Sequence, residues 1–134
     1  MKNYQDLSPK VQSIFRKLGF LKIENRGKPY YKGLKQGKIY RVFVPNKLKE
    51  LKDGASETEY GYVKLKQADG TFKDEAVHRL IAESIPNDEN KPVVHHKRIA
   101  RNKNSIEDLE WATYKENTAY YLEQTKNAMY KGVE

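Results

Sequence analysis

Short segments that alternate apolar and basic residues, separated by turn residues, constrain this chain most strongly. KIYRVFV at 38–44 alternates in this way and ends at Pro45, while FLKIEN and KPYYKG flank Arg26-Gly27. YGYVKLK at 60–66 and TFKDEAV at 71–77 are joined by QADG, a composition typical of a β-hairpin. The pattern predicts several short antiparallel strands rather than one long sheet or a helical bundle.

Helix signals lie on both sides of these strands. Ser8-Pro9 supplies an N-cap and a proline at the first helical position, and Gly19 ends the run. HRLIAESI at 78–85 predicts a second short helix, and TYKE at 113–116 has capping-box spacing, which predicts a third helix to about residue 129. Residues 46–59 are expected to form a short polar helix or a linker. The predicted fold class is therefore α+β.

Composition limits the class of protein further. A chain of 134 residues is expected to form one domain, or one small domain with an N-terminal attachment. It has no run of eighteen apolar residues and no apolar signal core at the N-terminus, so we expect no membrane span and no export. Because it has no Cys, cytoplasmic location fits, and a metal would need His, carboxylate or amide ligands.

The positive charge is concentrated in the first part of the chain. Residues 1–54 contain 14 Lys or Arg and 4 Asp or Glu, a net charge of +10, whereas the whole chain carries +8. Such asymmetry is typical of a region that binds a polyanion, most often nucleic acid. A basic surface with no binding function is the alternative that charge alone leaves open.

Residues 93–129 contain the side chains most suited to chemistry. VVHH is expected to form a strand, LEWAT the returning strand, and the following helix should turn Asn117 back toward them. His95 and His96 would then point to opposite faces, with His95 and Asn117 as a metal pair and His96 as a base oriented by Asp108. The alternative is a buried structural histidine, bonded to a main-chain carbonyl, beside an exposed neighbour.

VHRLIAESIPNDENKPVVHH at 77–96 and NKNSIEDLEWATYKEN at 102–117 resemble the HNH endonucleases of the phage and homing type. The resemblance covers residues 77–118 closely and GYVKLKQADGTF more loosely. It implies a C-terminal ββα-metal core, in which a hairpin is followed by a helix. The residues before this core predict a basic N-terminal helix and short antiparallel strands. The charge of residues 1–54 leads us to expect a basic DNA grip there, and the resemblance leads us to expect the nuclease core in residues 55–134.

The resemblance also implies a role for each residue of the site. His96 matches the general base, Asp108 the residue that positions it, and His95 and Asn117 the metal ligands. The resemblance implies one divalent ion, usually Mg²⁺ or a transition metal such as Mn²⁺. His95 replaces the usual Asp or Asn, and the loss of a hard oxygen ligand disfavours Mg²⁺ and favours Mn²⁺, Ni²⁺, Co²⁺ or Zn²⁺.

DNA is the expected partner. Basic residues beside the site and in the N-terminal strands are expected to contact its phosphates: Lys97, Arg98, Arg101, Lys103, Arg79, Lys32, Lys35, Lys38 and Arg41. One site per chain predicts nicking by a monomer, whereas cutting both strands would need a homodimer or two visits, so the oligomeric state stays open.

The sequence and the resemblance together predict a metal-dependent DNA endonuclease. The resemblance further implies that a phage or mobile element encodes it and that it acts in the cytoplasm of a bacterial host. Two departures favour an alternative. Arg98 to Arg101 replace the Asp-Gly-Asn-Lys common in the family, and Asp108 replaces Asn. The alternative is a catalytically weakened HNH-fold protein that binds DNA or a protein as a regulator or inhibitor.

Overall fold

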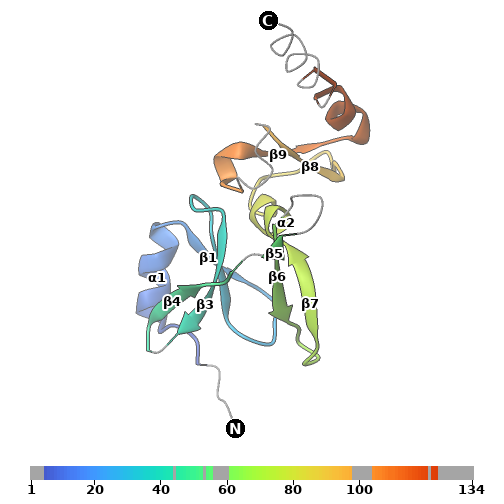
Figure 1. The fold of residues 1–134 in the computed structure, drawn as a ribbon. Coiled ribbons are helices and arrows are strands. Elements are labelled where there is room, and N and C mark those ends of the chain that lie inside the picture. Colours follow the sequence, from blue (N-terminus) through green and yellow to red (C-terminus); the bar gives the residue numbers. More distant parts are fainter. Residues whose placement is uncertain are drawn as a thin grey trace, which may run out of the picture.

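The computed structural model describes residues 5–43, 45–52, 54–55, 61–97, 104–120 and 122–123. Its N-terminal part is helix α1 (Pro9–Lys17) followed by a four-stranded antiparallel sheet (Figure 1). The Ser8 hydroxyl accepts a hydrogen bond from the Val11 amide, and Gly19 adopts a positive φ of 89° after the helix, as the cap and stop signals predicted. The sheet has the order β1 (Phe20–Ile23), β2 (Tyr30–Gly33), β3 (Lys38–Phe43) and β4 (Lys47–Glu50).

Strand β4 overturns the expectation of a helix or linker for this part of residues 46–59. Asn46 takes a positive φ of 61° in the turn that reverses the chain, so that Lys47 pairs with Phe43. The following residues continue the antiparallel ladder with β3, and the main-chain hydrogen bonds of that ladder outweigh the weak helical preference of KLKE.

The predicted hairpin is confirmed. Strands β6 (Gly61–Lys66) and β7 (Phe72–Ala76) pair antiparallel around a turn in which Gly70 has a φ of 89°. The short strand β5 (Gly54–Ala55) extends this second sheet at β6. Helix α2 (Val77–Ala82) begins directly after β7 and is shorter than the segment 78–85 that the sequence predicted.

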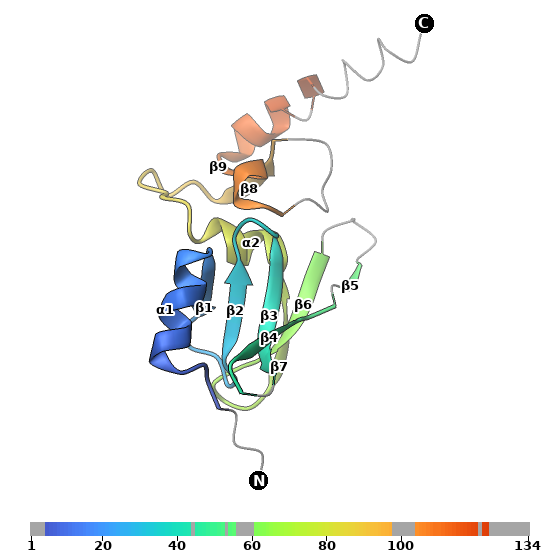
Figure 2. The same ribbon diagram turned by 90° about the vertical axis from the view of Figure 1, so that its left-hand side faces the viewer.

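The C-terminal part is a two-stranded hairpin and a helix. Helix α2 lies between this part and the two sheets formed by β1–β4 and β5–β7, which are the lower sheets in Figure 1 and Figure 2. Strand β8 (Val93–His96) pairs with β9 (Leu109–Ala112), and the 3₁₀ turn η1 (Ile106–Asp108) precedes β9. Residues 114–120 are helical, and reciprocal hydrogen bonds between Thr113 and Glu116 confirm the capping box. The predicted end of this helix near residue 129 lies outside the described residues.

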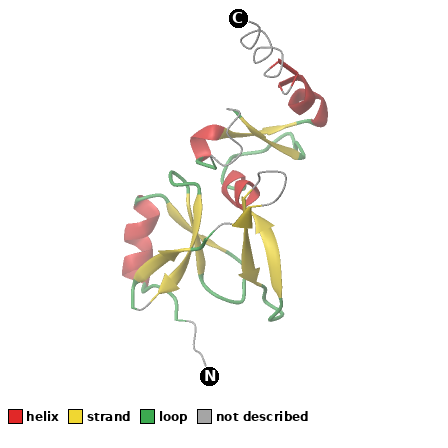
Figure 3. Ribbon diagram, in the orientation of Figure 1, coloured by secondary structure: helices red, strands yellow, loops and turns green. Residues whose placement is uncertain are grey.

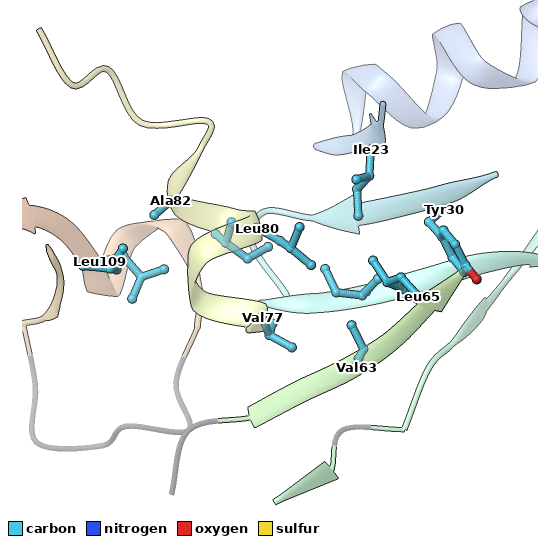
Figure 4. Packing of buried hydrophobic residues seen from close by; sticks show 11 residues of the cluster. Ile23, Tyr30, Val63, Leu65, Val77, Leu80, Ala82 and Leu109 are labelled. Carbon is cyan, nitrogen blue, oxygen red and sulfur yellow. The ribbon is translucent and has the colours of Figure 1, made fainter. Parts of the chain in front are cut away.

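One hydrophobic cluster connects the two N-terminal sheets, α2 and the C-terminal hairpin, and α2 lies at its centre. Its members come from both lower sheets, α2 and the C-terminal hairpin: Ile23, Tyr30, Ile39, Val63, Leu65, Val77, Leu80, Ile81, Ala82, Val94 and Leu109 (Figure 4). Because buried apolar area is the main stabilising contribution, the hairpin–helix unit is held to the N-terminal sheet through α2. The mixture of short strands and helices confirms the α+β class (Figure 3).

Polar contacts also cross residue 54, where the sequence suggested a functional division. Arg26 forms a two-pronged ion pair with Glu75, and the Tyr30 hydroxyl accepts from the Lys66 amide at 2.9 Å. The functional division between residues 1–54 and 55–134 stays a prediction. Of the helices in the described ranges, none has the length and apolar character to cross a membrane.

Candidate active site

The two adjacent histidines lie at the end of β8, and both are buried. His95 pairs with Glu110 and His96 with Leu109 across the hairpin, and each histidine is 7% exposed. Successive strand residues face opposite sides, so the His95 ring stacks on Tyr120 of the C-terminal helix while the His96 ring packs against His78 of α2. The arrangement differs from a buried histidine with an exposed neighbour, the alternative that the sequence left open.

His95 and Asn117 are brought together, as the sequence predicted. The His95 Nδ1 lies 3.2 Å from the Asn117 Oδ1, and on the other side of the ring Nε2 lies 3.9 Å from a Glu110 carboxylate oxygen. Asn117 reaches the hairpin because the capping box starts the helix at the residue after Thr113. The structure thus places an imidazole nitrogen and an amide oxygen at one point between β8 and the helix.

These two atoms fit a shared divalent cation. Ligands with bonds of about 2.1 Å to one ion lie about 3 Å apart when the angle between them is near 90°, and the observed separation is 3.2 Å. A nitrogen and an amide oxygen suit Mn²⁺ and later transition metals as well as Mg²⁺. Within the described part of the chain no group of three His, Cys, Asp or Glu side chains gathers, so these residues would supply two of the ligands.

His96 contacts a residue that the sequence analysis missed. The His96 Nε2 lies 3.0 Å from the side-chain oxygen of Asn104, which is 3% exposed. Facing an amide oxygen, Nε2 carries the proton and donates it, which leaves Nδ1 as the basic nitrogen of the neutral ring. The available signal was the pair of amides, Asn102 and Asn104, in a basic loop, since an Asn that becomes buried needs a hydrogen-bond partner.

Asp108, expected to position His96, is buried at the end of η1. Its main-chain carbonyl accepts from the Lys97 amide at 2.8 Å, and its own amide donates to the Ser105 carbonyl at 2.9 Å. The first bond joins the end of β8 to the residue before β9, and the second closes the η1 turn. An effect of the Asp108 carboxyl on His96 stays a prediction.

His78 forms the wall behind His96. Their ring centroids lie 5.3 Å apart in an edge-to-face arrangement. Burial, with smaller contributions from His96 and Arg79, lowers the pKa of His78 to about 4. His78 is therefore neutral at physiological pH, and it presents an uncharged surface to the proposed base.

The basic residues predicted to contact DNA differ in their placement. Lys97 and Lys35 are exposed, and Lys38 is half-buried. Arg41 and Lys49 both lie over the exposed Phe43 ring, and Arg79 donates to the Pro92 carbonyl at 3.0 Å. Arg98, Arg101 and Lys103 lie outside the described residues. The phosphate contacts of these side chains stay predictions.

Lys32 requires a correction. It is 8% exposed, and its ammonium donates to the Leu80 carbonyl at 2.6 Å. Burial lowers the pKa of this ammonium. Because Lys32 lies inside the junction between β2 and α2, it holds α2 on the N-terminal sheet and is not available to a DNA phosphate.

Comparison with known proteins supports the same architecture. No protein-family model matches the chain, and no curated protein matches it. The chain is similar to a solved structure described as "DNA binding and cleavage by the HNH homing endonuclease I-HmuI", with 27% identity and a TM-score of 0.55. The match covers 78% of this chain and 54% of the other, so the chain spans about half the length of that protein. The similarity supports an HNH-type fold for this α+β chain.

Proposed function

We propose that this protein is a metal-dependent endonuclease that hydrolyses DNA phosphodiester bonds. One observation carries the proposal: in an HNH-type fold, two buried, adjacent histidines face different amide partners, His95 with Asn117 and His96 with Asn104. Hydrolysis of a phosphodiester needs a group that takes a proton from water and a positive charge near the phosphate. His96 on one face of β8 would take the proton, and His95 on the other face would hold the positive charge.

His96 is the proposed general base. Its Nε2 donates to the Asn104 amide oxygen, so Nδ1 of the neutral ring accepts the proton of the attacking water. The neutral ring of His78 packs on one side of His96, while the carbonyl of Asp108 fixes the end of β8 through the Lys97 amide.

His95 and Asn117 are the proposed metal ligands. The Glu110 carboxylate near the far ring nitrogen orients His95 so that Nδ1 faces Asn117. His95 and Asn117 would hold a divalent ion, Mg²⁺ or Mn²⁺, with Ni²⁺, Co²⁺ or Zn²⁺ also suited to His95, and such an ion would supply positive charge beside the phosphate. Tyr120 stacks on the His95 ring at 4.3 Å between centroids and limits its rotation.

DNA is the proposed substrate and partner. The cations proposed to contact its backbone lie near the hairpin and on the N-terminal sheet: Lys97, Arg98, Arg101, Lys103, Arg79, Lys35, Lys38 and Arg41. A monomer with one site nicks one strand, and a homodimer would cut both. A phage or mobile element acting in the cytoplasm of a bacterial host is the setting that the HNH resemblance suggests.

Plasmid nicking tests this function. Wild type, His96→Ala, Asn117→Ala and the control Tyr114→Ala are compared with Mg²⁺, with Mn²⁺ and with EDTA. We expect nicking by wild type and Tyr114→Ala, because Tyr114 is 73% exposed at the start of the same helix. His96→Ala should bind DNA without cutting it. Asn117→Ala should not cut DNA either, and it should give no heat of metal binding in calorimetric titration. Cleavage that persists in EDTA or in His96→Ala would refute the proposal.

A second candidate is an HNH-fold regulator or inhibitor that binds DNA or a protein with weakened catalysis. Two features of the chain favour this candidate. The buried Asp108 stands where the HNH family that the chain resembles has Asn, and Arg98 and Arg101 lie in the segment where that family commonly has Asp-Gly-Asn-Lys. Under this proposal wild type retards DNA in a gel, leaves the plasmid intact with every metal, and gives no heat on metal titration.

A further inference from the structure

The turn between β2 and β3 contacts the residues that lead into η1. The Leu34 carbonyl accepts a hydrogen bond from the Ile106 amide at 2.8 Å, although these residues are 72 positions apart. Figure 1 and Figure 2 show this turn reaching from the N-terminal sheet toward the orange segment that leads into β9. A segment of the basic N-terminal half therefore lies directly against the proposed active site.

Gly37 makes this contact close. It is buried and has a φ of 64°, a conformation that side chains beyond glycine rarely adopt. A Cβ at this position would lie 2.4 Å from the main-chain carbon of Asn104 and 2.6 Å from the amide nitrogen of Ser105. The turn therefore presses on the main chain of Asn104 in a way that only glycine permits.

Asn104 connects the turn to His96. Asn104 lies two residues before Ile106, and its main chain packs against Gly37. Its side-chain oxygen lies 3.0 Å from the His96 Nε2. Asn104 is 3% exposed, so water does not compete for this amide. The placement of the His96 ring thus depends on a chain of contacts that begins in the N-terminal sheet.

We propose that the β2–β3 turn, residues 34–37, belongs to the catalytic machinery: it holds Asn104 in place, and Asn104 fixes the tautomer and orientation of His96. Asn104 is a positioning residue, because it acts through His96. The inference rests on the proposed nuclease function for its effect on cleavage, but the tautomer of His96 can be measured without it. The N-terminal sheet then contributes to the rate of the chemical step as well as to DNA binding.

The physical reason is the ambiguity of a neutral imidazole. Without an acceptor at Nε2 the proton distributes between both ring nitrogens, and a ring protonated at Nδ1 cannot take a proton from water there. A displacement of about 1 Å in a catalytic group costs up to about 100-fold in rate. A rigid support for Asn104 is therefore expected to act on kcat rather than on KM.

The test compares two glycines with similar backbone strain. Gly37→Ala introduces the contact with Asn104, whereas a Cβ at Gly70, which has a φ of 89°, would meet nothing within 4 Å, so Gly70→Ala is the matched control. We expect Gly37→Ala to lower the kcat of plasmid nicking by about 10–100-fold with KM unchanged. Gly70→Ala should leave both constants within about twofold.

Two further variants keep the test informative if Gly37→Ala does not fold. Ile106→Pro removes the N–H that donates to Leu34; proline is tolerated at the first position of a helical turn, and Ser105 already has the extended conformation that proline requires before it. Asn104→Ala removes the acceptor, and Asn104→Asp restores one at the same reach. We expect Ile106→Pro and Asn104→Ala to lower kcat and Asn104→Asp to recover most of it.

The ¹⁵N NMR signals of the His96 ring give a readout independent of cleavage. Wild type, Gly70→Ala and Asn104→Asp should show the proton on Nε2, and Gly37→Ala, Ile106→Pro and Asn104→Ala a mixture of tautomers. Retention of the Nε2 proton in Asn104→Ala, or an equal loss of activity in Gly70→Ala, would overturn the inference. If wild type fails to cut DNA while the tautomer shifts as described, the nuclease proposal fails and the positioning role stands.

Discussion

His78 should make the stability of this fold depend on pH in one direction. The ring lies in α2 and packs edge-on against His96, and burial lowers its pKa from 6.5 to about 4. Between these values the unfolded chain binds a proton that the folded chain does not. The free energy of unfolding therefore carries no penalty from His78 above the unfolded pKa, and falls as the pH drops from 6.5 toward 4.

The size of the effect follows from the difference between the two pKa values. A full difference of this size corresponds to about 3 kcal/mol. His78 is partly exposed, so solvent screening reduces the value, and we expect a loss of about 1–2 kcal/mol between about pH 7 and pH 5. Carboxylates with lowered pKa values, such as Glu75 with its Arg26 partner, lose their contribution at lower pH and hardly overlap this range.

Urea unfolding of wild type and His78→Gln at both pH values measures this loss. Trp111 is the single tryptophan, and its indole N–H donates to the carbonyls of Ala82, at the end of α2, and of Ile85, just after it. Its fluorescence therefore reports on the unfolding of the part of the chain that contains His78. Between pH 7 and pH 5 the free energy of unfolding of wild type should fall by about 1–2 kcal/mol more than that of the variant. Equal losses would show that His78 is not a buried neutral ring.

Three further predictions concern single side chains. Lys32→Met should leave the salt dependence of DNA binding unchanged, whereas Lys35→Met at the exposed turn should reduce the slope of log K against log salt by about one, as fluorescence anisotropy would show. Thr113→Ala removes one half of the capping box and should lower the free energy of unfolding by about 1 kcal/mol in urea titrations. Leu65→Ala, at 0% exposure, should cost about 2–5 kcal/mol in calorimetry, and the exposed Phe72→Ala much less.

Local signals in the sequence were sufficient for several elements. The Ser8 cap, the turn glycine at position 70 and the Thr113–Glu116 capping box each act within four residues, and each is found where the pattern predicted it. Strand β4 was missed because its conformation depends on pairing with β3, and nothing in KLKE itself favours a strand over a helix.

The candidate site was predicted only in part, because some of its contacts follow from local signals and others from long-range packing. His95 and Asn117 meet because a hairpin followed by a capped helix leaves little freedom between them, and both signals are local. Asn104 was missed because its importance comes from burial beneath Gly37, 67 residues earlier in the chain. Lys32 was assigned to DNA by its charge, which says nothing about the Leu80 carbonyl that binds it.

The α+β class, the hairpin and the helix caps follow from short-range periodicity and turn chemistry, so they can be predicted from the amino-acid sequence. The position of α2 between the N-terminal sheet and the C-terminal hairpin, and the close approach of the β2–β3 turn to Asn104, are visible only in the folded chain. Such contacts form between segments with no local relationship, and they are selected by the burial of apolar surface and the satisfaction of buried polar groups across the whole chain.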